Sequence, residues 1–225
     1  MYMYNYAYLI FVKLGRKMYR KFSKRIIDFV ISLVGMIVLL PIFAIISILI
    51  VIDNPGPIFF SQKRIGLNKS FFKLYKFRSM KTSTPHDTPT HLLENPEQYI
   101  TRMGKFLRKS SLDELPQLWN ILVGNMSIIG PRPALWNQYD LIAERDKYNA
   151  NDIRPGLTGL AQISGRDELE VVAKAKLDGD YVVKMSFGFD IKCFFKTVIA
   201  VFKHEGVVEG GTGRLKIEQK ETTKV

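Results

Sequence analysis

Residues 26–52, which read IIDFVISLVGMIVLLPIFAIISILIVI, constrain how the rest of this chain can fold. Asp28 is the only charged residue of this run, and residues 29–52 form 24 consecutive positions without a charge. A helix of that length matches the ~30 Å hydrocarbon core of a bilayer, so the run predicts a membrane helix. It is too long for the core of a signal peptide, and no small-residue cleavage site follows it. The alternative is a buried helix of a soluble protein.

Pro41 lies in the middle of the run and predicts a bend, because proline removes one helical hydrogen bond. Basic residues flank the run on both sides, and the positive-inside tendency favours keeping both ends in the cytoplasm. These residues are Lys13, Arg16, Lys17, Arg20, Lys21, Lys24 and Arg25 before the run, and Lys63, Arg64, Lys69, Lys73, Lys76 and Arg78 after it. We therefore expect a re-entrant helix, which enters one leaflet and returns, in preference to a helix that spans the bilayer.

The net charge of +12 and a pI near 9.7 indicate an anionic partner: nucleic acid, a membrane surface or phosphorylated substrates. Cys193 is the only cysteine, which excludes an internal disulfide and favours a reducing compartment. The three histidines show no metal-binding spacing.

Outside the apolar run, the pattern predicts a mainly α fold with short β-strands, an α+β protein. Four parts are expected: a basic amphipathic segment 1–25, the membrane helix 26–54, a globular domain 55–205 and a polar tail 206–225. Within the domain we expect strands at 58–60 and 71–78 with a basic turn at 62–66, a loop at 81–98, helices at 99–109 and 134–150, a turn at 154–159, and a helix at 167–184 that breaks near Gly179. Apolar residues recur at helical spacing from Ile191, which fits an interfacial helix or an ordinary core-facing one.

Asp113 and Glu114 are adjacent acids inside a basic stretch, KSSLDELPQLWN at residues 109–120. Ser111 and Glu114 match a capping box, and Pro116 suits a helix that starts at Asp113. An Asp113 carboxylate stabilised by a helix N-terminus and nearby cations is a plausible nucleophile toward phosphorus. Glu114 would then hold Mg²⁺ together with substrate oxygens. The alternative is a plain helix cap.

Pro131-Arg132-Pro133 adds a rigidly held guanidinium, whose planar fork suits phosphate. With it, the cations expected around the acids are Lys76, Arg78, Arg108 and Arg132. The sequence contains no phosphate-binding glycine loop of the Walker or dinucleotide type.

Eight motifs occur in a fixed order over residues 18 to about 205. They are Lys24-Arg25-x-x-Asp28, PGPIFF at 55–60, QKRIG at 62–66, YKFRSM at 75–80, SLDELPQLWN at 111–120, MSIIGPRP at 126–133, RPGLTG at 154–159 and QISGR at 162–166. In this order they resemble the bacterial sugar transferases, the small monotopic phosphoglycosyl transferases that start glycan assembly on a polyprenol carrier.

The resemblance implies transfer of a sugar-1-phosphate from a UDP-sugar to polyprenyl phosphate, undecaprenyl phosphate in bacteria, with release of UMP. It implies that Asp113 forms a covalent phosphosugar intermediate, that Glu114 serves Mg²⁺, and that Lys76 and Arg132 contact phosphate with help from Arg108. The implied setting is the cytoplasmic face of the bacterial inner membrane, with a re-entrant helix bent at Pro41 and the catalytic domain at 55–205. Downstream glycosyltransferases are implied partners and nucleic acid is not.

This sequence departs from the family pattern at Leu40, Asn125 and Leu160, where relatives often carry serine, aspartate and tryptophan, so the bend and local packing can differ. Two other functions compete with the transferase. A hydrolase would discharge the same covalent intermediate to water, and a basic adaptor or nucleic-acid binder would explain the pI but not the acidic pair.

Overall fold

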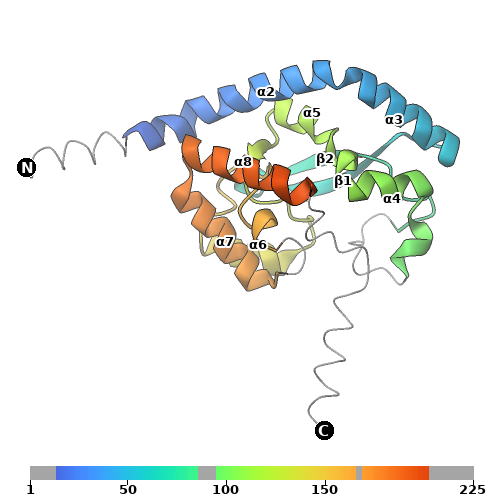
Figure 1. Ribbon diagram of the computed structural model, residues 1–225. Coiled ribbons are helices and arrows are strands. Elements are labelled where there is room, and N and C mark those ends of the chain that lie inside the picture. Colours follow the sequence, from blue (N-terminus) through green and yellow to red (C-terminus); the bar gives the residue numbers. More distant parts are fainter. Residues whose placement is uncertain (1–13, 86–94, 166–168, 203–225) are drawn as a thin grey trace, which may run out of the picture.

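A computed structural model describes residues 14–85, 95–165 and 169–202 (Figure 1). Expectations about residues 1–13, residues 86–94 of the loop at 81–98, Arg166 and the tail at 206–225 lie outside the described residues. The described part is mainly helical with short strands, as the sequence predicts.

The apolar run forms two helices, α2 (Lys24–Val38) and α3 (Leu40–Asp53), preceded by a π-helical turn at Tyr19–Ser23. The helical segments Leu14–Val38 and Leu40–Asp53 meet at an angle of 60°, and Pro41 lies in the first turn of α3. Among the described residues no single helix is long and apolar enough to cross a membrane, while this bent pair passes by length and composition together.

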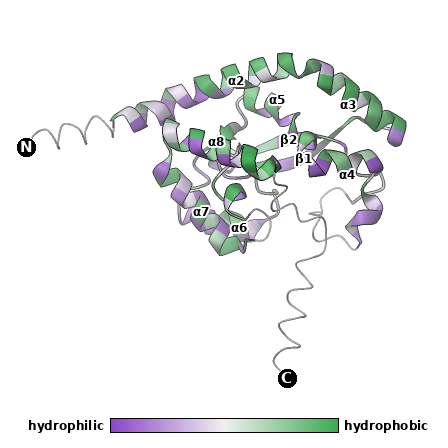
Figure 2. Ribbon diagram, viewed as in Figure 1, coloured by the Kyte–Doolittle hydropathy of each residue, from purple (hydrophilic) through white to green (hydrophobic). Residues whose placement is uncertain are grey.

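Many large apolar side chains of α2 and α3 are exposed, and green predominates over these two helices in Figure 2. Val38 is 66% exposed and Ile52 is 73% exposed. Exposed apolar surface of this extent marks a site of contact with a membrane or with another protein. A helix buried in the protein core is therefore the wrong interpretation of the run.

Polar residues at the start of α2 fix it to the rest of the protein. Lys24 pairs with Asp190 at 2.5 Å. Arg25 donates to the carbonyls of Ile121 and Leu122 at 2.6 and 2.7 Å. The Asp28 carboxylate accepts the backbone N–H of Ile128 at 3.0 Å. Lys24, Arg25 and Asp28, all in the first two turns of α2, therefore attach this helix to three separate segments of the protein.

Strands β1 (Phe59–Ile65) and β2 (Phe71–Phe77) pair antiparallel, with Phe59 opposite Phe77 and Ile65 opposite Phe71. The expected turn at 62–66 is wrong, because residues 62–65 belong to β1 and the chain reverses at residues 66–70. Asn68 and Lys69 adopt positive φ there, as a tight reversal requires.

A second sheet joins β3 (Ser127–Ile129) and β4 (Gly156–Thr158) in parallel, so the segment expected to be only a turn at 154–159 contains a strand. Helices α6 (Tyr139–Asp146) and α7 (Val171–Lys184) follow β3 and β4. Helix α7 is unbroken at Gly179, contrary to expectation. A Cβ there would lie 2.5 Å from Cβ of Tyr148, so the glycine permits close packing and causes no break.

Helix α8 (Phe187–Phe202) turns its large apolar residues outward, and Cys193 and Asp190 inward. Ile191, Phe194, Phe195 and Ile199 are all exposed, so this stripe does not face the core. The core-facing alternative for this segment is wrong.

Replacing Gly159 by alanine should lower the unfolding temperature, because the new Cβ would lie 2.0 Å from the carbonyl oxygen of Gly130. Overpacking of this kind costs about 1–3 kcal/mol. Gly188→Ala is the matched control, since its Cβ meets nothing within 4 Å. Thermal unfolding of both variants in detergent measures the difference, and equal unfolding temperatures would contradict the close approach of β3 and β4.

Candidate active site

Asp113 and Glu114 lie on a single 3₁₀ turn, Leu112–Glu114, between α4 (Arg102–Lys109) and α5 (Gln117–Leu122). The expected capping box is absent: Ser111 has a φ of 57° and its side chain makes no cap hydrogen bond. Helix α5 begins after Pro116, so an α-helix starting at Asp113 is also wrong. The left-handed Ser111 reverses the chain and presents both acids ahead of α5.

Two cations from separate elements hold Glu114. Lys76, near the end of β2, places its Nζ 2.7 Å from Oε1 of Glu114. Arg132 places Nη2 3.0 Å from the same oxygen. Burial alone would raise the pKa of Glu114, but these two cations outweigh it and hold the pKa well below its usual range. Glu114 is therefore a permanent anion that organises Lys76 and Arg132.

Asp113 has a different environment, although Lys76 reaches it too, with Nζ 3.7 Å from Oδ2. Burial raises the pKa of Asp113, Lys76 opposes that effect, and the charge of Glu114 adds to it. Arg108 and Arg132 lower the pKa to a smaller degree. The helix N-terminus that was expected to stabilise the Asp113 carboxylate is not the main influence on its pKa. Because burial and Glu114 raise that pKa, a further positive charge near the site would stabilise the ionised form of Asp113.

Buried polar contacts that the sequence analysis did not single out fix the positions of these groups. The Asn120 amide, fully buried, donates to the Lys73 carbonyl at 2.7 Å and accepts the Tyr75 N–H at 3.0 Å. It thereby locks α5 to the strand that carries Lys76. Arg64 donates to the Pro133 carbonyl at 3.0 Å and supports the loop that carries Arg132. In the sequence Asn120 closes the motif at 111–120, but nothing local shows that its amide binds the backbone of β2.

Arg78, expected among the phosphate ligands, is directed elsewhere. Its guanidinium donates to the carbonyls of Asn54 and Pro55, where the chain leaves α3. Burial lowers the pKa of Arg78, with Asp53 opposing. The structure thus brings together Asp113, Glu114, Lys76 and Arg132, with Arg108 in electrostatic range, and places Arg78 at the end of the apolar helix pair.

The acids offer two carboxylates to a metal ion, and no group of three or more potential metal-binding side chains occurs in the described ranges 14–85, 95–165 and 169–202. Magnesium commonly takes one or two carboxylates and fills its remaining positions with phosphate oxygens and water. A buried Asp113 with a raised pKa also favours a nearby cation. The donor set therefore fits magnesium that arrives with a phosphorylated substrate, and does not fit an all-protein metal cage.

A buried acid pair in contact with a lysine and an arginine is an arrangement suited to phosphate binding. Comparison with known proteins identifies the family, because the bacterial sugar transferase model matches residues 19–204. The chain belongs to the bacterial sugar transferase family and is an enzyme of that family.

The similarity to known proteins covers most of the chain. It is 37% identical to the exopolysaccharide production protein ExoY of Sinorhizobium fredii, over 82% of this chain and 87% of that protein. It is 38% identical to the UDP-glucose:undecaprenyl-phosphate glucose-1-phosphate transferase of Escherichia coli, over 80% of this chain and 40% of that protein. It is 36% identical to the UDP-galactose-lipid carrier transferase of Erwinia amylovora, over 83% of this chain and 42% of that protein. The chain thus spans less than half the length of the latter two relatives.

The two arginines should respond differently to replacement by lysine. Arg78→Lys should lower the unfolding temperature without substrate, because lysine cannot reproduce the contacts to two backbone carbonyls. Arg132→Lys should leave that temperature nearly unchanged and lower transferase turnover about 10- to 100-fold, as loss of one charge-assisted hydrogen bond would. Thermal unfolding and initial rates on the same preparations measure both effects. An Arg78→Lys protein of normal stability with a raised KM would mean that Arg78 binds substrate.

Proposed function

We propose that this protein transfers a sugar-1-phosphate from a UDP-sugar to undecaprenyl phosphate, releases UMP, and thereby initiates assembly of a bacterial glycan such as an exopolysaccharide or capsule. The observation that carries the proposal is the pairing of Asp113 and Glu114 with Lys76 and Arg132. The names of the Escherichia coli and Erwinia amylovora relatives support the substrate classes. Glycosyltransferases that extend the lipid-linked sugar would act next.

In the first half-reaction, a carboxylate oxygen of Asp113 attacks the sugar-bearing phosphorus of the UDP-sugar. The bond from that phosphorus to the bridging oxygen breaks, and its electron pair leaves with UMP. Lys76 lies within reach of both acids and is suited to bind the phosphate oxygens that approach them. Arg132 is suited to a second phosphate contact, since its side chain remains 41% exposed while it touches Glu114.

In the second half-reaction, a phosphate oxygen of undecaprenyl phosphate attacks the same phosphorus. The bond to Asp113 breaks, and the carboxylate is regenerated. Both attacking groups are anions, so the transfer requires no general base, and neutralisation of charge is the main task of the site. Magnesium would supply part of that neutralisation, with Glu114 and the substrate phosphates as its ligands.

The proposed setting is the cytoplasmic face of the bacterial inner membrane, with α2 and α3 as a re-entrant pair. Both ends of this pair contact the same globular domain. Asp28 accepts the Ile128 N–H at the first end, and Asp53 accepts the Met103 N–H at 2.9 Å at the second. One domain cannot lie on two sides of a membrane, so these contacts favour re-entry over a span.

The covalent step is tested by incubating purified protein with magnesium and a UDP-sugar radiolabelled in the sugar, without lipid. Wild-type protein should acquire label and release UMP, while Asp113→Asn should acquire none, because an amide is not a nucleophile toward phosphorus. Lys147→Gln, a change at an exposed residue of a surface ion pair, is the control and should label normally. Labelling of Asp113→Asn at the wild-type level would refute the assignment of the nucleophile.

Addition of polyprenyl phosphate to the labelled protein separates transfer from hydrolysis. A transferase moves the label into lipid, whereas a hydrolase yields free sugar-1-phosphate. The identity of the sugar would be determined by measuring UMP release with a panel of UDP-sugars. Glucose and galactose are the first candidates, because relatives of similar identity are named for these two sugars.

Topology is tested with single cysteines at Lys21 and Pro55, which are exposed just outside the two ends of the pair. In intact cells a membrane-impermeant maleimide should label neither position, and it should label both in inverted membranes. Cys193 should stay unlabelled in the folded protein, since it is 1% exposed and burial raises the pKa of its thiol to about 11. Labelling of either introduced cysteine from outside would establish a spanning helix.

A further inference from the structure

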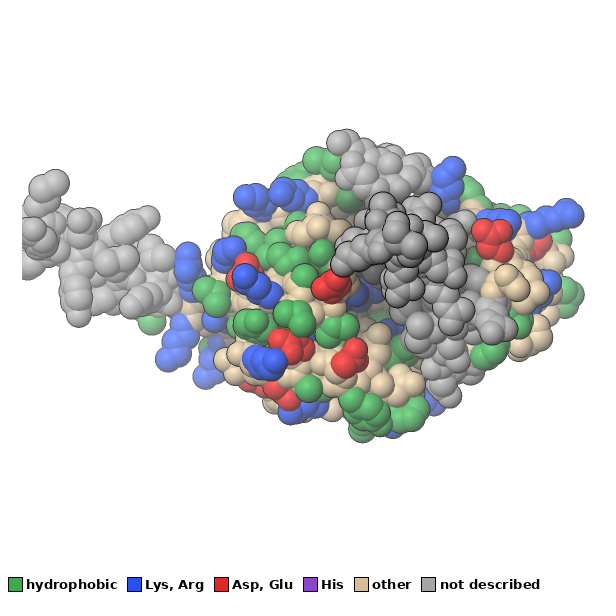
Figure 3. All heavy atoms as spheres, turned by 90° about the horizontal axis from the view of Figure 1, so that it is seen from below, with side chains coloured by type: hydrophobic (Ala, Val, Ile, Leu, Met, Phe, Trp, Pro, Cys, Tyr) green, Lys and Arg blue, Asp and Glu red, His purple; other side chains and the backbone are tan. Residues whose placement is uncertain are grey.

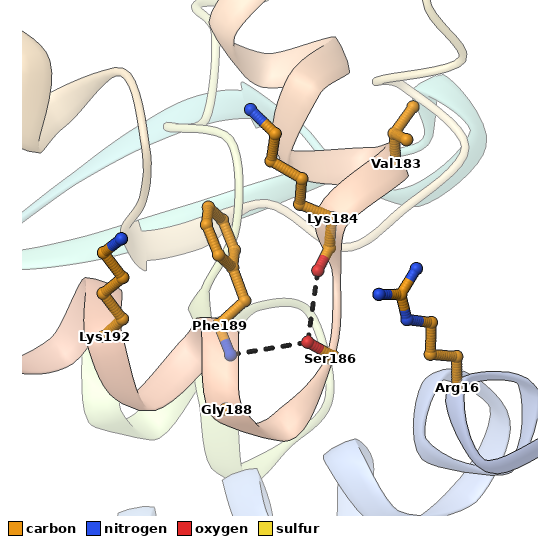
Figure 4. A pocket seen from close by; sticks show the side chains of 7 residues that line it. All are labelled: Arg16, Val183, Lys184, Ser186, Gly188, Phe189 and Lys192. Carbon is orange, nitrogen blue, oxygen red and sulfur yellow. Dashed lines mark hydrogen bonds between the residues drawn. The ribbon is translucent and has the colours of Figure 1, made fainter. Parts of the chain in front are cut away.

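A surface pocket of about 430 Å³ lies between the helical segment that precedes α2 and the corner joining α7 to α8 (Figure 4). Its lining includes the cations Arg16, Lys184 and Lys192, and none of its lining residues is acidic. Of these cations, Lys184 also pairs with Asp180 at 3.7 Å, on the exposed side of α7. The pocket shares no residue with the site around Asp113.

The walls of the pocket are held together by contacts outside it. Arg20 donates to the carbonyls of Val182 and Val183 at the end of α7. Tyr19 donates to Asp190 of α8 at 2.7 Å, and its ring meets that of Phe187 at 6.1 Å, edge to face. Arg16 and Lys192 therefore come from separate elements that the fold fixes relative to each other, so their positive charges share one opening.

The rim of the pocket is open at Gly188, where an added Cβ would meet nothing within 4 Å. Next to it, α8 carries the exposed apolar residues Phe187, Ile191 and Phe195, four residues apart and hence on one face of the helix. A cationic pocket that continues into an apolar stripe matches a molecule with an anionic head and an apolar tail. Free phosphate would use the pocket and leave the stripe uncovered.

We propose that this pocket binds the phosphate headgroup of an anionic membrane phospholipid, with its acyl chains along the stripe of α8. The proposal rests on the membrane location put forward above and concerns a site separate from the reaction. Bound lipid phosphate would bridge Arg16 and Lys192, and so fasten the segment before α2 to α8 at the membrane surface. The ligand class is a phosphodiester, and the lipid is its expected source.

The test uses the full chain in a mild non-ionic detergent, titrated with phosphatidylglycerol or phosphatidylcholine, with bound lipid counted by native mass spectrometry. Gly188→Glu places an acid on the open rim, and Gly188→Gln has nearly the same shape without the charge. Retention of phosphatidylglycerol should fall at least about tenfold in Gly188→Glu, as expected for one repulsive charge within a few ångströms, and stay near wild type in Gly188→Gln. Phosphatidylcholine retention should not distinguish the two.

A second pair of variants tests the cations directly. Arg16→Gln/Lys192→Gln should lose phosphatidylglycerol, whereas Lys69→Gln/Lys147→Gln, with the same change in net charge at surface ion pairs near α6, should retain it. Equal retention in Gly188→Glu and Gly188→Gln, or in the two double variants, would overturn the site. Displacement of the lipid by equimolar inorganic phosphate would overturn the lipid as its source. The labelling of Asp113 and the cysteine accessibility assay report on the proposed function independently of these outcomes.

Discussion

The attachment of the start of α2 to three separate elements is the constraint on which the rest of the structure depends. Asp28 accepts a hydrogen bond from a backbone N–H of β3, and Arg25 donates to two carbonyls at the end of α5. Lys24 forms an ion pair with Asp190 of α8. Helix α5 directly follows the turn that carries the acidic pair, so Arg25 fixes the far end of the helix next to the site. The apolar helix pair is thus part of the framework that positions the chemistry. Seen from below, on the side away from α2 and α3, the described surface carries scattered side chains of both charges (Figure 3).

The pKa values of Asp113 and Glu114 shift in opposite directions because the two acids have different neighbours. Glu114 has two close cations, which keep it ionised in spite of burial, and it in turn orients Lys76 and Arg132. Asp113 is buried beside that anion and shares Lys76 at a longer distance, so its charged form is less well compensated. A carboxylate that the protein compensates incompletely remains more reactive than one already saturated by ion pairs. Under the proposed mechanism, this difference suits Asp113 to attack phosphorus and Glu114 to stay in its ion pairs.

Local signals in the sequence predicted the features that depend on local structure. The charge-free run, the break at Pro41, the strand at 71–77 and the pair Asp113-Glu114 could all be recognised from spacing and composition. Features that depend on distant partners could not. Gly179 resembles a helix breaker in the sequence because Tyr148, which packs on it, lies far away in the chain, in the turn after α6. Arg78 was counted with the phosphate ligands because nothing local reveals that the end of α3 uses its donors.

The contacts at the C-terminal end of α3 are consistent with the bend between the two helices. Asp53 is held by the Met103 N–H at the start of α4, and Arg78 of the segment after β2 holds the carbonyls that follow it. A straight helix over residues 24–53 would be about 45 Å long, at 1.5 Å per residue. The 60° bend beside Pro41 shortens the distance between its two ends by several ångströms and curves the pair around the domain that holds them. Because α4 leads into the acidic turn and β2 carries Lys76, the anchors at the second end of the pair lie on or next to the elements that position Asp113, Glu114 and Lys76.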